Sequence, residues 1–332
     1  LAPYDLGGTI HVGINNQIGF TTLPEEGRSA RHPTDIAKLV EAPVLHVNGD
    51  DPDAVYQVAI VAAHWRATFA SDIVIDLVCY RRPGHNEFDE PRFTQPLMYR
   101  AIDARPPVNE IYAARLEAEG IDTSLMAAEA DTMSERIAAG LAAAKSYSVN
   151  RADWFEGAWK GFRAGSTVEM LDSPETGVPL DELRRLGRLL TEVPAGFSLD
   201  PKVARFLEER RHTIETGEGI SWATGEALAL ASLLAEGTPV RFSGQDSVRG
   251  AFTQRHWELH DQTTGARHLV FAPAAEDPSY VEIHNTPLIE HAVLCFEYGV
   301  SLADPRRLVV WEAQFGEFLN IAQPVFDQCI AC

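Results

Sequence analysis

The feature that most constrains the fold is an alternation of strand and helix within residues 43–79. Residues 43–47 (PVLHV) and 72–79 (DIVIDLVC) have the apolar, β-branched composition of buried strands. Between them Asp51 precedes Pro52, a pair typical of a helix N-cap and first helical position. The helix that follows carries one apolar face, made of Val55, Val58, Ala62, Trp65 and Phe69. Strand, capped helix and strand in this order predict a βαβ unit of a parallel sheet.

The same alternation returns near the other end of the chain. A helix is predicted over residues 222–235 and another over 288–298, with strands at 239–243, 268–272, 280–284 and 307–311. From about residue 110 to 216 the strand patterns vanish, and helical spacing takes their place. Two amphipathic helices are expected there, one carrying Met126, Ala130, Met133, Ile137 and Leu141, the other Leu183, Leu186 and Leu190. The sequence therefore predicts two α/β parts joined by helices.

Charge and composition exclude several classes of protein. The 332 residues include 28 Lys+Arg and 48 Asp+Glu, and the net charge of −20 disfavours nucleic-acid binding because phosphates would be repelled. No run of about 18 apolar residues predicts a membrane span, and residues 1–13 lack the pattern of a secretory signal. Four cysteines do not form a disulfide framework. We therefore expect a reducing compartment, the cytoplasm of a bacterium or the mitochondrial matrix of a eukaryote.

Amide side chains follow the short strand predicted at residues 9–14. Asn15, Asn16, Gln17 and Ile18 come directly after it, where ligands bind in open parallel sheets. An amide oxygen and a backbone carbonyl are hard donors that suit Mg²⁺ holding a phosphate group. A plain polar turn is the alternative, because asparagine favours turns in any case.

A charged loop follows the strand at residues 72–79. It contains His85 among Arg81, Arg82 and Glu87, a combination suited to binding an anionic substrate or moving protons. A solvated charged loop explains the same residues equally well.

Two further places carry polar residues worth testing. His256 and His260 stand four apart, a spacing that binds metal on a helix, but no carboxylate or cysteine completes a ligand set, which favours a structured loop. Glu290 opens an otherwise apolar helix. It is either a partly buried acid–base group or an acidic residue favoured there by the helix dipole.

Taken in order along the chain, six segments resemble one family. They resemble the thiamine diphosphate-dependent decarboxylase, or first, component of 2-oxoglutarate dehydrogenase complexes. The six are GTIHVGINNQIGFTT, HVNGDDPDAV, DLVCYRRPGHNEFDEPRFTQPLMY, ISWATGEALALASLL, VRFSGQDSVRGAFTQRHWELHDQ and VVWEAQFGEFLNIAQPVFDQ.

The resemblance implies a transketolase-like fold of two parallel-sheet thiamine diphosphate-binding domains. Residues 1–110 would be the later part of the diphosphate-binding domain, residues 111–216 a helical linker, and residues 217–332 the pyrimidine-binding domain without its C-terminal part. The family's magnesium-binding Asp and its upstream substrate loops have no counterpart here. The chain is thus expected to be an internal fragment that is inactive alone.

The resemblance also implies roles for single residues. Asn16 and the carbonyl of Ile18 would bind Mg²⁺, while Asn15 and Gln17 would lie beside the diphosphate. His85 would be the active-site histidine of the GHNE loop.

In the last domain, Glu290 would hydrogen-bond the ring nitrogen of the aminopyrimidine. Phe315, or less readily Phe318, would offer its ring to the same group. Ile289 stands where the family has a small polar residue and Cys295 where it has glycine. Both changes are expected to alter the packing behind the carboxylate.

The implied activity is oxidative decarboxylation of 2-oxoglutarate, a reaction of the tricarboxylic acid cycle. Thiamine diphosphate and Mg²⁺ would be the cofactors, and a lipoyl group of the succinyltransferase component would accept the succinyl unit. The implied state is a homodimer, with no nucleic-acid or membrane partner. The alternatives are a 2-oxoadipate-specific or carboligating relative, or a non-catalytic assembly fragment.

Overall fold

A computed structural model describes residues 4, 6–148, 156–163, 165, 166, 171 and 173–331. The chain divides into two compact units, residues 1–149 and 150–332, and each is described by itself. Both units contain a three-stranded parallel sheet, which confirms the predicted α/β class. Within the described residues, no helix is long and apolar enough to cross a membrane.

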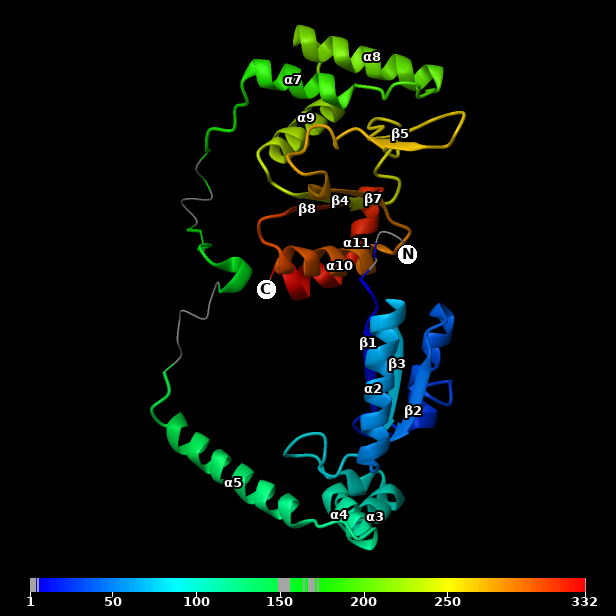
Figure 1. Cartoon of the computed structure of the whole chain (residues 1–332), viewed down its shortest axis with the longest axis vertical. Coiled ribbons are helices and arrows are strands. Elements are labelled where there is room, and N and C mark those ends of the chain that lie inside the picture. The colour runs from blue at the N-terminus through cyan, green and yellow to red at the C-terminus, as the bar shows by residue number, and fades with distance from the viewer. Residues whose placement is uncertain are drawn as a thin grey trace. The chain divides into compact units, whose positions relative to one another are not determined.

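The N-terminal unit is built on the predicted βαβ unit. Its sheet has the order β1-β3-β2, with β1 at Ile10–Asn15, β2 at Val44–Asn48 and β3 at Ile73–Val78. Helix α2 (Pro52–Phe69) connects β2 to β3 and lies along the sheet (Figure 1). Asn15 and Asn48 both pair with Val78, so all three strands end at the same level.

Helix α2 begins as the sequence predicts. The Asp51 side chain accepts a hydrogen bond from the Ala54 backbone N–H at 3.2 Å, which satisfies a free donor of the first turn. Ala62 is fully buried against the sheet, in a small core with Val47, Ile73 and Ile75. The apolar face predicted for α2 extends one turn further than the part of the helix that packs on the sheet. Phe69 is 59% exposed and contacts only the Trp65 ring among aromatic groups of the described chain.

Helices and irregular loops make up the rest of this unit as described. The apolar face predicted for residues 126–141 lies on α5, but Met133, Ile137 and Leu141 are each more than half exposed. The predicted helix is therefore confirmed, and its apolar face is largely exposed in this unit. The helices are α1 (Pro24–Gly27), the 3-10 helices η2 (Pro33–Val40) and η3 (Pro91–Phe93), α3 (Pro96–Ala104), α4 (Val108–Ala118) and α5 (Ser124–Ala144).

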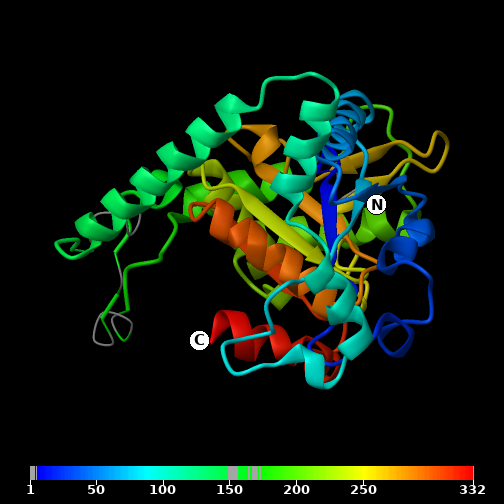
Figure 2. The same ribbon diagram turned by 90° about the horizontal axis from the view of Figure 1, so that it is seen from below.

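The C-terminal unit has a second parallel sheet and a hairpin. The sheet order is β7-β4-β8, with β4 at Val240–Gly244, β7 at Val281–Asn285 and β8 at Leu308–Glu312, and the antiparallel pair is β5 (Glu258–His260) with β6 (Arg267–Leu269). Helix α10, orange in Figure 2, lies along the sheet. The helices are η5 (Gly157–Trp159), α7 (Leu180–Leu190), α8 (Pro201–Thr216), α9 (Trp222–Ala235), η6 (Pro278–Tyr280), α10 (Glu290–Ala303), η7 (Gly316–Phe318), α11 (Leu319–Val325) and a π-helical turn, η8 (Phe326–Ile330).

The strand expected at residues 268–272 is largely wrong. Strand pairing stops at Leu269, and Val270 and Phe271 belong to a turn although both are fully buried. They pack into the main core, where the ring of Phe271 meets that of Trp257 at 5.3 Å. Burial rather than strand pairing explains this apolar run.

A buried ion pair joins the sheet to helix α10. Arg241 on β4 donates from Nε and Nη2 to the Glu297 carboxylate at 2.6 and 3.0 Å, and the Ser243 hydroxyl lies 2.9 Å from the same group. Arg241 and Glu297 are each less than 5% exposed. Removing one partner of such a pair leaves a buried charge uncompensated. This contact therefore fixes α10, and with it Glu290, against the sheet.

Candidate functional site

The turn after β1 is held to the end of β3 by hydrogen bonds. The Cys79 N–H donates to the Asn15 carbonyl at 2.9 Å, and the Gln17 side-chain amide donates to the Cys79 carbonyl at 2.7 Å. Gln17 has a φ of 63°, a left-handed conformation that turns the chain sharply. The sequence after the strand thus forms a fixed turn at the carboxyl edge of the sheet, where ligands bind in this class of fold.

The structure brings the four predicted diphosphate and metal residues together. Asn15, Asn16, Gln17 and Ile18 all line one cavity of about 390 Å³. The Asn16 side-chain oxygen accepts a 3.3 Å hydrogen bond from the Ile18 N–H, so these two residues are neighbours in space. An amide oxygen and a main-chain carbonyl are hard, neutral donors, and they fit a hydrated Mg²⁺ that carries a phosphate.

Arg28 lines the same cavity, and sequence reasoning missed it. Its guanidinium donates to the Arg31 carbonyl at 3.2 Å, which anchors the side chain near the turn. A guanidinium matches phosphate oxygens in charge and geometry. Nothing in the local pattern marks Arg28, because it lies in an irregular segment after α1.

The loop that carries His85 lies against the same turn. The His85 and Phe20 rings are 4.7 Å apart, and the His85 N–H donates to the Asp89 carboxylate at 2.7 Å. A Cβ on Gly84 would lie 2.3 Å from the Asp89 carbonyl, so only glycine fits at this close approach. His85 itself is exposed. The structure therefore places the predicted histidine beside the predicted phosphate-binding turn.

In the C-terminal unit, Glu290 is the first residue of α10. It is 5% exposed, and no basic side chain of the described residues forms an ion pair with it. A carboxylate in this position is favoured by the helix dipole and the free N–H groups of the first turn. It is therefore a buried, unpaired acidic group next to a helix N-terminus.

The two departures from the family pattern lie near Glu290 but are not packed behind it. Ile289 occupies the N-cap position without a side-chain hydrogen bond and is 56% exposed. Cys295 is also exposed. The expected change of packing behind the carboxylate is therefore wrong within this unit, and the loss of a polar cap at Ile289 is the remaining effect.

A polar cavity of about 350 Å³ opens where strands β4 and β7 end. Its amide side chains come from Gln245, Asn285 and Gln314, none of which is among the site residues predicted from the sequence. The Gln245 amide donates to the Leu288 carbonyl at 3.1 Å, and the Gln314 amide donates to Asp246 at 2.9 Å. Their location in the sequence could have identified two of them, because Gln245 and Asn285 lie at the carboxyl ends of predicted strands.

The two aromatic candidates belong to one cluster. The Phe315 ring is 5.8 Å from that of Phe318 and 6.4 Å from that of Phe252, both in edge-on contacts. Phe315 is 40% exposed and Phe252 is 76% exposed, so the cluster lies at the surface of this unit. Phe315 is therefore open to solvent in this unit, whereas Phe318 is partly buried.

The histidine pair of the same unit does not form a helical metal site. His256 lies in a loop with a φ of 48°, and His260 ends strand β5. The His256 ring packs on Phe206 at 4.9 Å, and burial together with Arg210 and Arg249 lowers its pKa. The interpretation as a structured loop therefore agrees with the structure.

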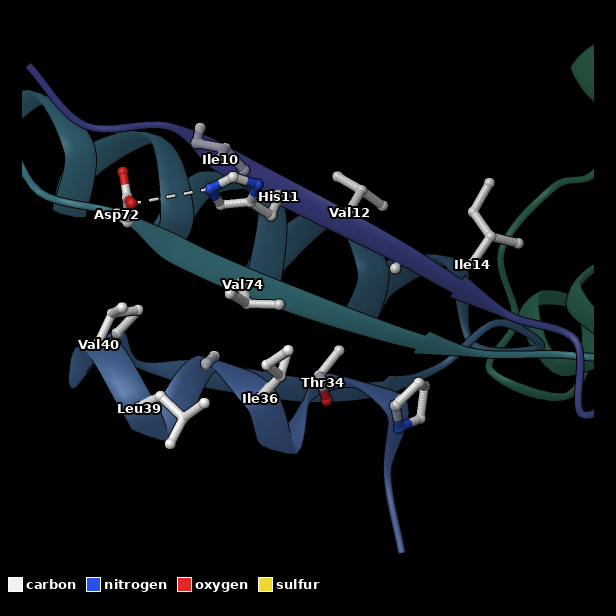
Figure 3. Close-up of a pocket in the computed structure, with 14 residues that line it drawn as sticks. Ile10, His11, Val12, Ile14, Thr34, Ile36, Leu39, Val40, Asp72 and Val74 are labelled. Carbon is white, nitrogen blue, oxygen red and sulfur yellow. Dashed lines mark ion pairs between the residues drawn. The ribbon is translucent and has the colours of Figure 1, made fainter. Parts of the chain in front are cut away.

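A further cavity of about 770 Å³ in the N-terminal unit is mostly apolar. Figure 3 shows Val12 and Ile14 of β1 on one side and Ile36, Leu39 and Val40 of η2 on the other. Apart from the His11–Asp72 ion pair at 3.8 Å, its wall offers few charged groups. None of the predicted site residues lines it.

Two segments of the chain match known protein families. Residues 3–152 match the family described as dehydrogenase E1 component, and residues 218–331 match the transketolase pyrimidine binding domain. The chain thus contains sequence that matches both domain families. Both belong to thiamine diphosphate-dependent enzymes, and the predicted family resemblance is confirmed.

Three relatives align with the chain over its whole length. The chain is 49% identical to the 2-oxoglutarate dehydrogenase E1 component of Brucella anthropi and 48% identical to those of Brucella ovis and Brucella abortus, with 100% of the chain aligned. It spans 33% of the length of each of these relatives.

Proposed function

We propose that this chain supplies cofactor-binding and catalytic residues for the oxidative decarboxylation of 2-oxoglutarate, with transfer of the succinyl unit to a lipoyl group. The observation that carries the proposal is Glu290, a buried and unpaired carboxylate at a helix N-terminus within the transketolase pyrimidine binding match. The names of the relatives, which are 2-oxoglutarate dehydrogenase E1 components, support the choice of substrate.

In this proposal the N-terminal unit binds the charged end of the cofactor. Asn16 Oδ1 and the Ile18 carbonyl bind Mg²⁺, while Asn15 and Gln17 contact the diphosphate. The shared cavity of these residues and its guanidinium, Arg28, support this assignment. The oxygen donors are neutral, so Arg28 adds positive charge beside an anionic group.

The C-terminal unit carries the candidate residues for the aminopyrimidine of the cofactor. Glu290 holds a proton against a ring nitrogen of the aminopyrimidine, and the Phe315 ring packs against that group. Thiamine diphosphate, when bound, supplies the electron sink that decarboxylation of a 2-oxo acid needs. His85 donates a proton to, or stabilises negative charge on, the substrate oxygen.

The proposal extends to the domains and to the assembly. Residues 1–110 form the diphosphate-binding part, 111–216 the linker and 217–332 the pyrimidine-binding part. The partners are a second copy of the enzyme and the lipoyl-bearing succinyltransferase component. The cytoplasmic location expected from the sequence stays a prediction.

The test is Glu290→Gln in the full-length enzyme that contains this chain. Turnover should fall by on the order of 10²-fold or more, because an acid–base role of this kind is lost while the shape is kept. Thermal unfolding should change little. Glu218→Gln, at an exposed glutamate, is the matched control and should leave turnover unchanged. A loss of less than about threefold for Glu290→Gln, which is well under 1.4 kcal/mol, would contradict the assignment.

A further inference from the structure

Two histidines and one aspartate of the N-terminal unit meet on the face of its sheet. His46 lies on β2, Asp76 lies beside it on β3, and His32 immediately precedes η2. The ligand atoms of the three side chains all lie within 4.8 Å of one another. None of the three takes part in the proposed reaction.

The contacts within this cluster converge on one oxygen. His46 Nδ1 lies 2.7 Å and His32 Nδ1 3.1 Å from Asp76 Oδ2. The two imidazole rings are 4.2 Å apart. An ionised carboxylate only accepts hydrogen bonds, so both rings direct the same nitrogen at the same acceptor. Two Nδ1 atoms and a carboxylate thus share one small volume.

Asp76 is the unusual member of the cluster. It is 0% exposed, and its Oδ1 atom has no hydrogen-bond partner in the described part of the chain. No lysine or arginine among the described residues forms an ion pair with it; its pairs are with the two histidines. A buried carboxylate without a firm positive partner is costly, and a cation would compensate it.

The histidines give the cluster an opening to solvent. The side chain of His46 is 43% exposed and that of His32 is 30% exposed, while the Asp76 side chain is fully buried. An ion can therefore reach the imidazoles from outside and keep water at a remaining position. The net charge of −20 also attracts cations to the molecule.

We propose that His32, His46 and Asp76 bind a divalent transition-metal ion of the Zn²⁺ class. Two imidazole nitrogens and one carboxylate oxygen form a ligand set for Zn²⁺ and related ions, whereas Mg²⁺ prefers oxygen ligands. Metal–ligand distances of about 2.0–2.2 Å require the three atoms to lie roughly 3–4 Å apart. Small side-chain rotations reach this geometry. Each neutral imidazole then carries its proton on Nε2 instead of Nδ1, which frees the Nδ1 lone pair for the ion. The site is separate from the Asn16 and Ile18 oxygens proposed for Mg²⁺.

The bound ion would link three segments of the unit. His32 caps η2, and the other two ligands lie on adjacent strands, so the ion fastens η2 to the sheet. This effect does not depend on thiamine diphosphate or on catalysis. It is therefore measured on binding and on stability, not on turnover.

The experiment is a titration of the metal-free 332-residue chain with Zn²⁺ against a chromophoric chelator, and with Co²⁺ followed by visible absorption. One equivalent should bind, raise the unfolding temperature and resist excess Mg²⁺. His32→Ala and His46→Ala should each weaken binding at least about tenfold, since each removes a direct ligand and loss of an outer contact alone costs that much. His64→Ala, at an exposed histidine of α2, is the matched control and should bind like the parent chain.

A structure of the Zn²⁺-loaded chain gives a second measurement that needs no variant. An anomalous-scattering peak should lie between His32 Nδ1, His46 Nδ1 and the Asp76 carboxylate. A peak elsewhere, or equal Zn²⁺ affinity in the parent and in His32→Ala/His46→Ala, would overturn the proposal. So would the lack of any Zn²⁺-dependent shift in unfolding temperature, which would leave the histidines as hydrogen-bond partners of Asp76 alone.

Discussion

At the scale of single residues, Asp261 holds a loop and a hairpin together. Its Oδ2 accepts from the Ser198 N–H at 2.6 Å, and its Oδ1 accepts from the Thr263 and Thr264 N–H groups at 2.9 and 2.7 Å. The Ser198 and Thr264 backbone bonds are the main cause that lowers the pKa of Asp261 from its ordinary 3.8 to about 2. The folded state thus favours the ionised form of this carboxyl.

A pH-dependent contribution to stability follows. Because the folded pKa is the lower one, the stabilisation is complete above about pH 4 and is lost as the pH falls from 4 towards 2. Asp261→Asn should lower the unfolding temperature at pH 7, and the gap to the parent chain should narrow below pH 4. Melting curves between pH 7 and 3 measure this difference in unfolding temperature. The control Asp277→Asn, where the carboxylate accepts from the backbone N–H and the side chain of the single residue Ser279, should show a smaller gap in unfolding temperature. A gap for Asp261→Asn that is constant with pH would contradict the assignment.

Single residues also show what sequence can reveal about a site. Asn15 to Ile18 were predicted because the end of a parallel strand is a position visible in sequence. The sequence does not indicate a site at Asp76, since this residue lies in an apolar run and its partners His32 and His46 are 44 and 30 positions away. Only the register of β2 against β3 and the path of η2 bring these three together. Arg28 has no signal in the sequence either, because it lies in an irregular segment after α1.

At the scale of elements, helices α7 and α8 pack through a glycine. Gly187 on α7 is buried, and a Cβ there would lie 2.4 Å from Cγ2 of Ile214 on α8. Ile214 is itself buried in the main core, so it has little room to move. The glycine sets how closely the two helices approach.

Gly187→Ala should therefore destabilise the C-terminal unit by about 1–3 kcal/mol, the usual cost of overpacking a core. Gly140→Ala, on α5, is the matched control, because nothing lies within 4 Å of its added Cβ. That substitution should stabilise its helix by roughly 0.5–1 kcal/mol, since alanine replaces glycine on an exposed helix. Denaturant unfolding of the two variants measures the free energy of unfolding, which should fall for Gly187→Ala and rise for Gly140→Ala. A destabilised Gly140→Ala or a neutral Gly187→Ala would refute this account of the packing.

The elements also separate what periodicity can predict from what it cannot. The cap at Asp51 and the helix over residues 222–235 depend on local pattern, and the structure has both. Burial depends on what covers a face. The local pattern therefore does not predict which apolar residues are buried and which are exposed. Leu141 of α5 is 67% exposed although it is on the apolar face, whereas Val270 is buried without belonging to a strand.

At the scale of the whole molecule, each unit has its own core. The described core cluster of the N-terminal unit contains four buried residues around Ile73, and the larger of two clusters in the C-terminal unit contains eighteen around Leu234. More buried apolar surface gives a larger stability, so the two units differ in this respect. Units with separate cores also unfold separately unless a large interface couples them.

Calorimetry of the 332-residue chain should therefore show two transitions, with the N-terminal unit unfolding first. Ile73→Ala should lower only the first transition and Leu234→Ala only the second, because each removes buried methyl groups from one core at a cost of about 2–5 kcal/mol. Gly187→Ala, like Leu234→Ala, should lower the temperature of the second transition only. If instead one transition is seen, and both Ile73→Ala and Leu234→Ala lower it together, the units fold as one cooperative body. Zn²⁺ adds an independent marker, since its proposed ligands all lie in the N-terminal unit: it should raise the first transition and leave the second where it was.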